Sequence, residues 1–233
     1  MYRLITTANH KTVKGEKQGY LTGILYLAPG NIADPAFNAC PHASAGCTAA
    51  CLYKAGRGMF SNVQHARVRK TRELIADTSE FIRRLCNDIT WLTQKAARKG
   101  LTPVFRLNGT SDISWETVRY GQIPQRFPAL QFYDYSKSIR RVLNPRRPTN
   151  YHLTFSRSEN NDTQCLRALE CGANVAAVFD VVPVGEKLWG YKIIDGDNDD
   201  LRFLHKKPVI VGVKAKGPAR KEMTGFVIRE QRT

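Results

Sequence analysis

The sequence predicts an α/β fold, a partial (β/α)6 barrel of about six strands. Short apolar runs alternate with segments of helical periodicity along the chain. Polar residues follow most of the apolar runs, as they do around the mouth of a β/α barrel. The chain has 233 residues, which suits one core and makes a complete eight-stranded barrel unexpected. A single domain spanning residues 1–233 is therefore expected.

The first predicted strand is the apolar run Gly23–Leu27, which ends at Ala28-Pro-Gly30 and leads directly into a cysteine-rich loop. Several runs are apolar throughout, as parallel strands covered on both faces should be. The further strands are predicted at residues 103–107, 130–133, 151–155, 174–179 and 208–213.

Helices are predicted between these strands. One opens near Ser61 and runs to Ala76, and a second begins at Asp77, where Glu80 three residues later completes a capping-box pattern. The second helix is expected to end at Gly100. Its apolar stripe, spaced by 3.6 residues, is Ile82, Leu85, Ile89, Leu92 and Ala96. A compact helix is predicted with Asp162 as its cap and Gly172 as its closing residue. An antiparallel excursion is predicted within residues 182–204.

Three cysteines lie close together after the first predicted strand. Cys40, Cys47 and Cys51 have the spacing C-x6-C-x3-C. Clustered thiolates in a loop are typical ligands of a soft metal or an iron–sulfur cluster. A structural zinc site usually has four ligands, so three favour a [4Fe-4S] cluster with one open iron. The alternatives are three ordinary thiols, or one disulfide with a spare cysteine.

The fourth cluster ligand is left open by the sequence. Cys86, Cys165 and Cys171 are expected to act mainly as small hydrophobic residues. Each of them, and His42 between the first two clustered cysteines, is an alternative fourth ligand.

Polar residues at the predicted strand ends form the second candidate site. In a β/α barrel they would surround one mouth beside the cysteine loop and bind a small-molecule ligand or substrate. The competing interpretation of each residue is a helix cap or a surface ion pair. The candidate binding residues are Asn108, Ser111, Asp112, Asp134, Lys137, Ser156 and Ser158, with Arg157, Asp180, Lys214 and Lys216 near them.

Composition narrows the class of protein. The formal net charge of +16 makes nucleic acid an alternative partner, although no helix-turn-helix, zinc-finger or RNA-binding signature accompanies it. No phosphate-binding glycine loop and no hydrolase triad signature occurs. No apolar run approaches the roughly eighteen residues of a membrane span, and no signal peptide is recognisable, so a cytoplasmic protein is expected.

The order of strand and cysteine loop resembles the radical S-adenosylmethionine superfamily. In that superfamily three cysteines hold a [4Fe-4S] cluster and S-adenosylmethionine chelates the open iron. The resemblance implies a radical-SAM-like barrel, in which Asp112 would hold the ammonium group of S-adenosylmethionine. The superfamily typically has C-x3-C-x2-C with an aromatic residue before the last cysteine, whereas Ala50 stands there in this chain. Binding of S-adenosylmethionine therefore stays open.

A closer resemblance, over most of the chain, is to the bacteriophage gene product 88 family. It implies a viral protein in the cytoplasm of an infected bacterial host, and it carries no settled reaction. The matching residues are Cys40-Pro, Gly46-Cys47, Cys51-Leu-Tyr, Ala55–Gly58, Arg106–Asp112, Phe132–Lys137, His152–Ser158, Asp200–Arg202 and Lys214–Gly217.

Two functional hypotheses follow. The first is an iron–sulfur protein whose open iron faces the polar pocket and supports radical-SAM-like or redox chemistry, and the sequence leaves open whether it is an enzyme. The second is a basic nucleic-acid-binding module without catalysis, stabilised by the cluster or by zinc.

Overall fold

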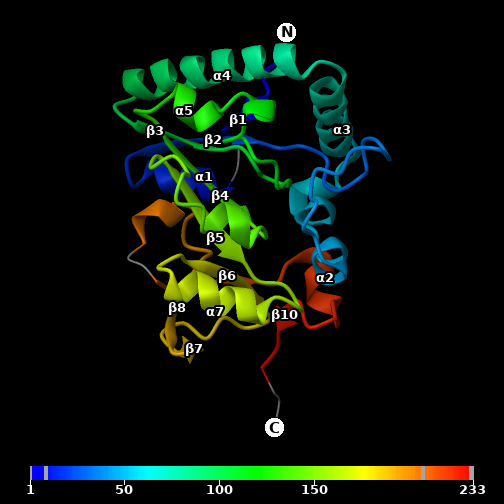
Figure 1. Cartoon of the computed structure of the whole chain (residues 1–233), viewed down its shortest axis with the longest axis vertical. Helices are drawn as coiled ribbons and strands as arrows, with labels where there is room; N and C mark the ends of the chain where they lie inside the picture. The colour runs from blue at the N-terminus through cyan, green and yellow to red at the C-terminus, as the bar shows by residue number, and fades with distance from the viewer. Residues whose placement is uncertain (1, 8–9, 206–207, 231–233) are drawn as a thin grey trace.

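The computed structural model describes residues 2–7, 10–205 and 208–230 (Figure 1). It is a mixed α/β structure built on a ten-stranded, mostly parallel sheet. The strands follow the order β1-β2-β3-β4-β5-β6-β9-β8-β7, with β10 paired to β6 off this path. Because β1 and β7 stand at opposite ends of this order, the sheet is open and does not close on itself.

The strands of the described residues are short, and most are apolar. They are β1 (Ile5–Thr6), β2 (Tyr20–Leu25), β3 (Thr102–Arg106), β4 (Gln131–Ser136), β5 (Tyr151–Ser156), β6 (Val175–Phe179), β7 (Lys187–Leu188), β8 (Tyr191–Asp195), β9 (Ile210–Lys214) and β10 (Val227–Ile228).

The six strands predicted from the sequence correspond to β2, β3, β4, β5, β6 and β9, with ends displaced by up to three residues. Each is parallel to the next, so their carboxyl ends lie at one edge of the sheet. The antiparallel excursion predicted within residues 182–204 is confirmed, because β7 and β8 form an antiparallel pair. Its second strand, β8, also extends the main sheet by pairing in parallel with β9.

Strand β10 takes over the place of β5 along one edge of β6. β5 pairs with the start of β6 at Val175 and Ala176, and β10 pairs with its end at Val178 and Phe179. The opposite edge of β6 is covered along its whole length by β9. The sheet therefore divides after Ser156, and the last part of the described chain fills the gap.

Helices connect the strands and cover the sheet. They are α1 (His10–Glu16), α2 (Ala45–Ala49), α3 (Ser61–Ala76), α4 (Thr78–Arg98), α5 (Ile123–Arg126), α6 (Ile139–Val142) and α7 (Asp162–Glu170), with the 3-10 helices η1 (Leu52–Lys54), η2 (Gly56–Met59), η3 (Val118–Tyr120), η4 (Arg202–Leu204) and η5 (Gly217–Lys221).

The predicted bounds of the longer helices are confirmed. The side chain of Asp77 caps α4 by accepting a hydrogen bond from the Glu80 amide at 2.9 Å. Gly100 follows this helix with a φ of +66°, a left-handed conformation that glycine adopts without steric cost. The predicted cap of α7 is displaced by one residue, because Asp162 is the first residue of the helix and Asn161 occupies the capping position before it.

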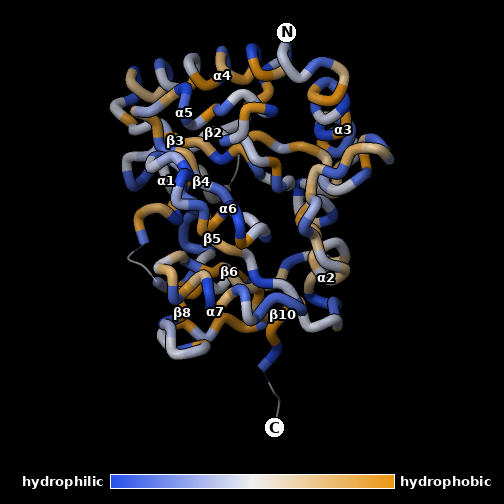
Figure 2. Tube along the Cα trace, in the orientation of Figure 1, coloured by the Kyte–Doolittle hydropathy of each residue, from blue (hydrophilic) through white to orange (hydrophobic). Residues whose placement is uncertain are grey.

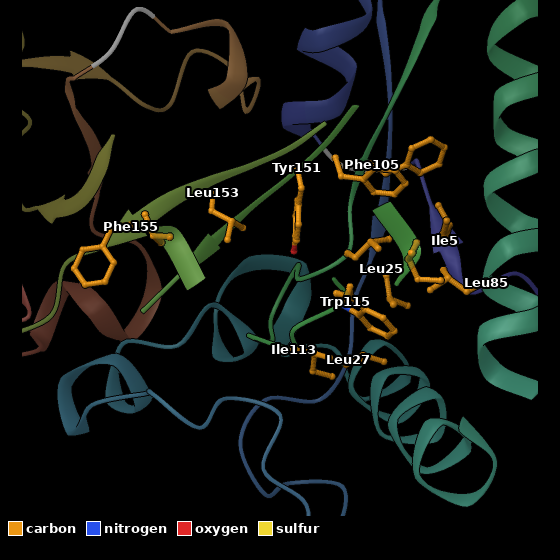
Figure 3. Packing of buried hydrophobic residues seen from close by; sticks show 14 of the residues in the cluster. Ile5, Leu25, Leu27, Leu85, Phe105, Ile113, Trp115, Tyr151, Leu153 and Phe155 are labelled. Carbon is orange, nitrogen blue, oxygen red and sulfur yellow. The ribbon is translucent and has the colours of Figure 1, made fainter. Parts of the chain in front are cut away.

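The main core lies between α4 and the first strands. Leu85 of α4 lies close to Ile5, Leu25 and Phe105 in Figure 3, and all four belong to one buried cluster. Hydrophilic and hydrophobic segments alternate along α4 in Figure 2, as expected of a helix with one buried face. Burial of this apolar surface is the main driving force that fixes the helix on the sheet. Over the described residues, no helix combines the length and the apolar character that a membrane span requires.

Candidate functional site at the carboxyl ends of the strands

The cysteine segment, residues 40–51, packs against residues at the carboxyl ends of β6 and β9 and at the start of β10. Figure 1 shows its helix α2 beside β10. Cys47 and Ala50 pack against Phe226 and Val227, so the segment has a small apolar cluster of its own. Gly46 is needed at the contact, because a Cβ there would approach Thr224 Oγ1 to 2.3 Å and Phe226 Cβ to 2.6 Å.

Glu159, which follows β5, ties down the start of α2. Its carboxylate accepts hydrogen bonds from Ser44 Oγ at 2.6 Å and from the Gly46 amide at 2.8 Å. Ser44 Oγ in turn caps the helix by accepting from the Cys47 amide at 3.1 Å. Partial burial raises the pKa of Glu159, but these hydrogen bonds lower it more, so the pKa lies below its ordinary value.

The three clustered cysteines are free thiols, each half-buried. Cys40 Sγ lies 3.6 Å from the carbonyl oxygen of Thr110, in the loop after β3. Burial, together with the nearby Cys51, Cys47 and Asp112, raises the pKa of Cys40 to about 12, although a hydrogen bond with the backbone of Gly30 lowers it. Burial also raises the pKa of Cys51, which is raised by Cys47 and lowered by Arg67 and Lys137. Cys47 and Cys51 are therefore close enough to Cys40 to raise its pKa, and Cys47 is close enough to Cys51 to raise that of Cys51.

The cysteines fit a metal cluster in the type and number of their donor atoms. A metal binds the thiolate, so it would offset the burial that keeps these thiols protonated. Within residues 2–7, 10–205 and 208–230, however, no group of three or more His, Cys, Asp or Glu side chains has the arrangement of a metal site. His42, between the first two cysteines, is exposed.

Asn108, Ser111 and Asp134 form a buried hydrogen-bonded group behind this edge. The Asn108 amide nitrogen Nδ2 donates to Asp134 Oδ2 at 3.2 Å, and its Oδ1 accepts from Ser111 Oγ at 2.8 Å. Asp134 also accepts from Tyr151 Oη at 2.8 Å. In Figure 3 the hydroxyl end of Tyr151 points toward the segment that carries Ile113 and Trp115. These polar groups join the loop after β3 to the middle of β4 and to the start of β5.

Asp134 has a strongly shifted pKa. Only 1% of the residue is exposed. Burial raises its pKa to about 7, although nearby Arg106 and the hydrogen bonds from Tyr151 and Asn108 act in the opposite direction. The carboxyl group therefore gains a proton at a pH where an exposed aspartate is fully ionised.

Asp112 is the centre of a second polar group. It accepts hydrogen bonds from Ser136 Oγ at 3.1 Å and from the Lys137 amide at 3.0 Å. Its other oxygen forms an ion pair with Arg141 Nη1 at 2.5 Å. Arg141 also binds both carboxylate oxygens of Glu116, at 2.8 and 2.9 Å. This bidentate geometry fixes the loop after β3 against the end of β4.

The remaining predicted residues divide between this edge and other places. Lys137 Nζ donates to Ser156 Oγ at 3.1 Å and lies 5.5 Å from the ring of Phe226. Ser158 Oγ instead donates to Asn160 Oδ1 at 3.1 Å, within its own loop. The edge therefore joins the cysteines to Asp112, Lys137 and Ser156.

The outlying candidates have partners of their own. Arg157 pairs with Asp162, Asp180 accepts hydrogen bonds from the amides of Val181 and Glu230, and Lys216 pairs with Asp197. Lys214 is exposed. Of the other cysteines, Cys86 lies on α4, Cys165 is buried in α7 and Cys171 is exposed after that helix.

Sequence reasoning missed Arg67, Arg141, Glu116 and Glu159 as residues of this edge. Arg67 lies on the buried face of α3 with Lys70, Thr71 and Leu74. The spacing i, i+3, i+4, i+7 is that of a helix core stripe. The presence of two basic residues, Arg67 and Lys70, in such a stripe was the sequence feature that could have predicted a buried polar site. Arg141 and Glu116 are distant in sequence and gave no local signal.

Comparison with known proteins gives one match. The family model described as gene product 88 matches residues 3–230, which is nearly the whole chain. No curated protein and no solved structure gives a significant match.

Proposed function

The chain belongs to the phage-associated gene product 88 family, and we propose that it is an iron–sulfur protein. Cys40, Cys47 and Cys51 are the proposed ligands of a [4Fe-4S] cluster, and its open iron faces the polar edge of the sheet. The observation that carries the proposal is that three free, half-buried thiols lie near one another at this edge: Cys47 and Cys51 raise the pKa of Cys40, whose Sγ lies 3.6 Å from the carbonyl oxygen of Thr110 in the loop after β3.

The chemistry of the edge supports this proposal. Three thiolates leave one iron of a [4Fe-4S] cluster without a cysteine ligand. When bound, such a cluster supplies an electron or a Lewis-acidic iron at the open position. Lys137 contributes positive charge beside Cys51, and its ammonium donates only to the hydroxyl of Ser156 among the contacts of the described residues. Lys137 would hold an anionic or hydroxyl group of a ligand at the open iron.

The arrangement of the sheet supports a likeness to radical S-adenosylmethionine barrels as the finer form of the proposal. The strands β2, β3, β4, β5, β6 and β9 are parallel neighbours in chain order, and the cysteine segment follows the first of them. S-adenosylmethionine is then a candidate ligand. Because Asp112 is paired with Arg141, holding an ammonium group there would compete with this ion pair. We further propose that the protein acts in the cytoplasm of the infected host, where reducing conditions keep these thiols free.

The first experiment is anaerobic purification with quantitation of iron and acid-labile sulfide. We expect about four irons per chain, and loss of most of the iron in Cys40→Ser, Cys47→Ser and Cys51→Ser. The matched controls are Cys86→Ser and Cys171→Ser, which change the same chemical group away from the edge. A change in the electron paramagnetic resonance spectrum on adding S-adenosylmethionine would support the finer form. Zinc in place of iron, or equal iron in all five variants, would overturn the proposal.

The net charge of +16 favours a second candidate, a basic nucleic-acid-binding module without catalysis. Several arginines are committed to internal ion pairs, with Arg106 bound to Asp200 and Arg141 bound to two carboxylates. The accessible positive charge is therefore smaller than the total. This candidate requires an affinity for nucleic acid that falls steeply between about 50 and 200 mM salt. An affinity unchanged over that range, or no binding, would exclude it.

A further inference from the structure

Arg67 is a buried cation without a carboxylate partner among the described residues. It lies in the middle of α3, and only 8% of the residue is exposed. Its Nε and Nη1 are buried and make no hydrogen bond. The described part of the chain provides no carboxylate ion pair for this side chain. Burial lowers the pKa of Arg67, but an arginine stays charged in a folded protein.

Other buried arginines of the chain differ from Arg67. Arg106 lies 2.7 Å from Asp200, and Arg141 lies 2.5 Å from Asp112. Each therefore has a carboxylate that compensates its charge. An arginine buried without such a partner is energetically costly, so its retention points to an anion that binds there.

The surroundings of Arg67 are those of a ligand site. The guanidinium carbon lies 4.8 Å from the ring centre of Tyr26 and 5.6 Å from that of Tyr53. Cys51 is also close enough to affect the pKa of Arg67. Tyr26 directly follows β2, and Tyr53 lies in η1 just after the cysteine segment. The guanidinium is thus held between two rings at the same edge as the thiols.

We infer that Arg67 binds an oxyanion, a carboxylate or phosphate group of a small ligand, beside Cys51. A guanidinium presents its N–H donors in a planar fork that suits both groups, and the Nε and Nη1 donors of Arg67, which lie on different sides of the group, are the atoms without partners. Lys137, which also acts on Cys51, adds positive charge near the same thiol. The inference deepens the proposed function, because it names the class of ligand that reaches the cluster. It rests on the proposed function for the presence of that cluster beside Arg67.

The test measures anion binding to the full chain as purified. Inorganic phosphate and acetate are added separately at constant ionic strength, with sodium chloride as the balancing salt, and the thermal midpoint is followed. We expect at least one of the two oxyanions to raise the midpoint of the wild type. Comparing the shift of the midpoint with phosphate and with acetate distinguishes a phosphate site from a carboxylate site.

Variants of α3 assign the response to Arg67. Arg67→Gln should weaken the apparent affinity by about tenfold or more, and Arg67→Lys should weaken it less, because the charge remains and the fork is lost. The matched control is Arg69→Gln, an exposed arginine of the same helix that lies over Tyr2. Its response should equal that of the wild type.

Iron is quantified in the same samples, so that the two proposals fail separately. Loss of the anion response in Arg67→Gln with wild-type iron content supports the oxyanion site. An equal response in Arg67→Gln, or no response of the wild type beyond that to chloride, overturns it. Iron-free wild type that still responds through Arg67 keeps the oxyanion site and removes the cluster.

Discussion

The consecutive helices α3 and α4 differ in the face that each one buries, which is mostly polar in α3 and mostly apolar in α4. The buried face of α4 is almost wholly apolar, and Leu85, Ile89 and Leu92 are fully covered in the main core. The buried face of α3 instead carries Arg67, Lys70 and Thr71. Apolar residues need only close packing, whereas each buried polar group needs a partner. The difference separates a helix that stabilises the fold from one that organises a site.

Two of the three polar residues on α3 have partners within the chain. Lys70 Nζ donates to the carbonyl oxygen of Leu4 at 2.8 Å, and Thr71 Oγ1 accepts from the amide of Ala28 at 2.8 Å. These bonds join α3 to the segment before β1 and to the start of the loop that carries the cysteines. Arg67 lacks such a bond at two of its nitrogens. Arg67 therefore differs from Lys70 and Thr71, whose hydrogen bonds are purely structural.

The largest expected effect concerns the apolar side of this comparison. Leu85→Ala should lower the free energy of unfolding by about 2–5 kcal/mol, because it removes buried methyl groups and leaves a cavity under α4. Chemical denaturation measures the change. Thr90→Ala, at an exposed position of the same helix, should alter stability by less than about 0.5 kcal/mol. Equal losses in both variants would contradict the role of α4.

The next expected effect concerns a buried polar group, Asp134, and the dependence of stability on pH. Asp134 has a folded pKa of about 7 against an ordinary value of 3.8. Between these values the folded chain holds a proton that the unfolded chain has released, so stability falls as pH rises from about 4 to 7. The difference is at most about 4 kcal/mol, at 1.36 kcal/mol for each pH unit.

Asp134→Asn should remove this part of the pH dependence. Denaturation midpoints at several pH values between about 4 and 8 would show a flatter profile than the wild type. Asp195→Asn is the control, because Asp195 is only partly buried at the end of β8. A profile of equal slope in Asp134→Asn and wild type would place the titration elsewhere.

The smallest expected effect comes from comparing two buried arginines, Arg67 without a carboxylate partner and Arg106 with one. Arg67→Met should leave the stability of the ligand-free chain unchanged to within about 1 kcal/mol, or raise it, because an uncompensated buried charge is replaced by an apolar side chain. Arg106→Met should destabilise the chain clearly, because it leaves the buried Asp200 without its ion-pair partner. Urea denaturation distinguishes the two, and a large loss in Arg67→Met would show that Arg67 has a structural partner.

The sequence was informative where local pattern decides structure. The apolar runs predicted the six parallel strands, and Asp77 with Glu80 predicted the start of α4. The strands β1 and β10 each span two residues, and their positions depend on pairing with β2 and β6. No local pattern specifies such short strands, because tertiary contacts decide them.

The same division applies to the candidate site. Cys40, Asp112 and Lys137 were predicted to lie at one edge. The amide of Lys137 donates to Asp112, and Asp112 lies near enough to Cys40 to raise its pKa. The sequence did not predict that the side chain of Asn108 would form hydrogen bonds inside the fold. Those bonds depend on Asp134, Ser111 and Ile113 lying next to it in the folded chain. The importance of Arg67 depends on Tyr26 and Tyr53, which come from other segments.

The packing of the cysteine segment has a consequence for the order of events during synthesis. Cys47 and Ala50 rest on Phe226 and Val227, and Gly46 lies against Thr224. These partners are translated more than 170 residues after the cysteines. On the ribosome the segment therefore emerges long before the surface that receives it. Its final position is reached only after residue 227 has left the exit tunnel.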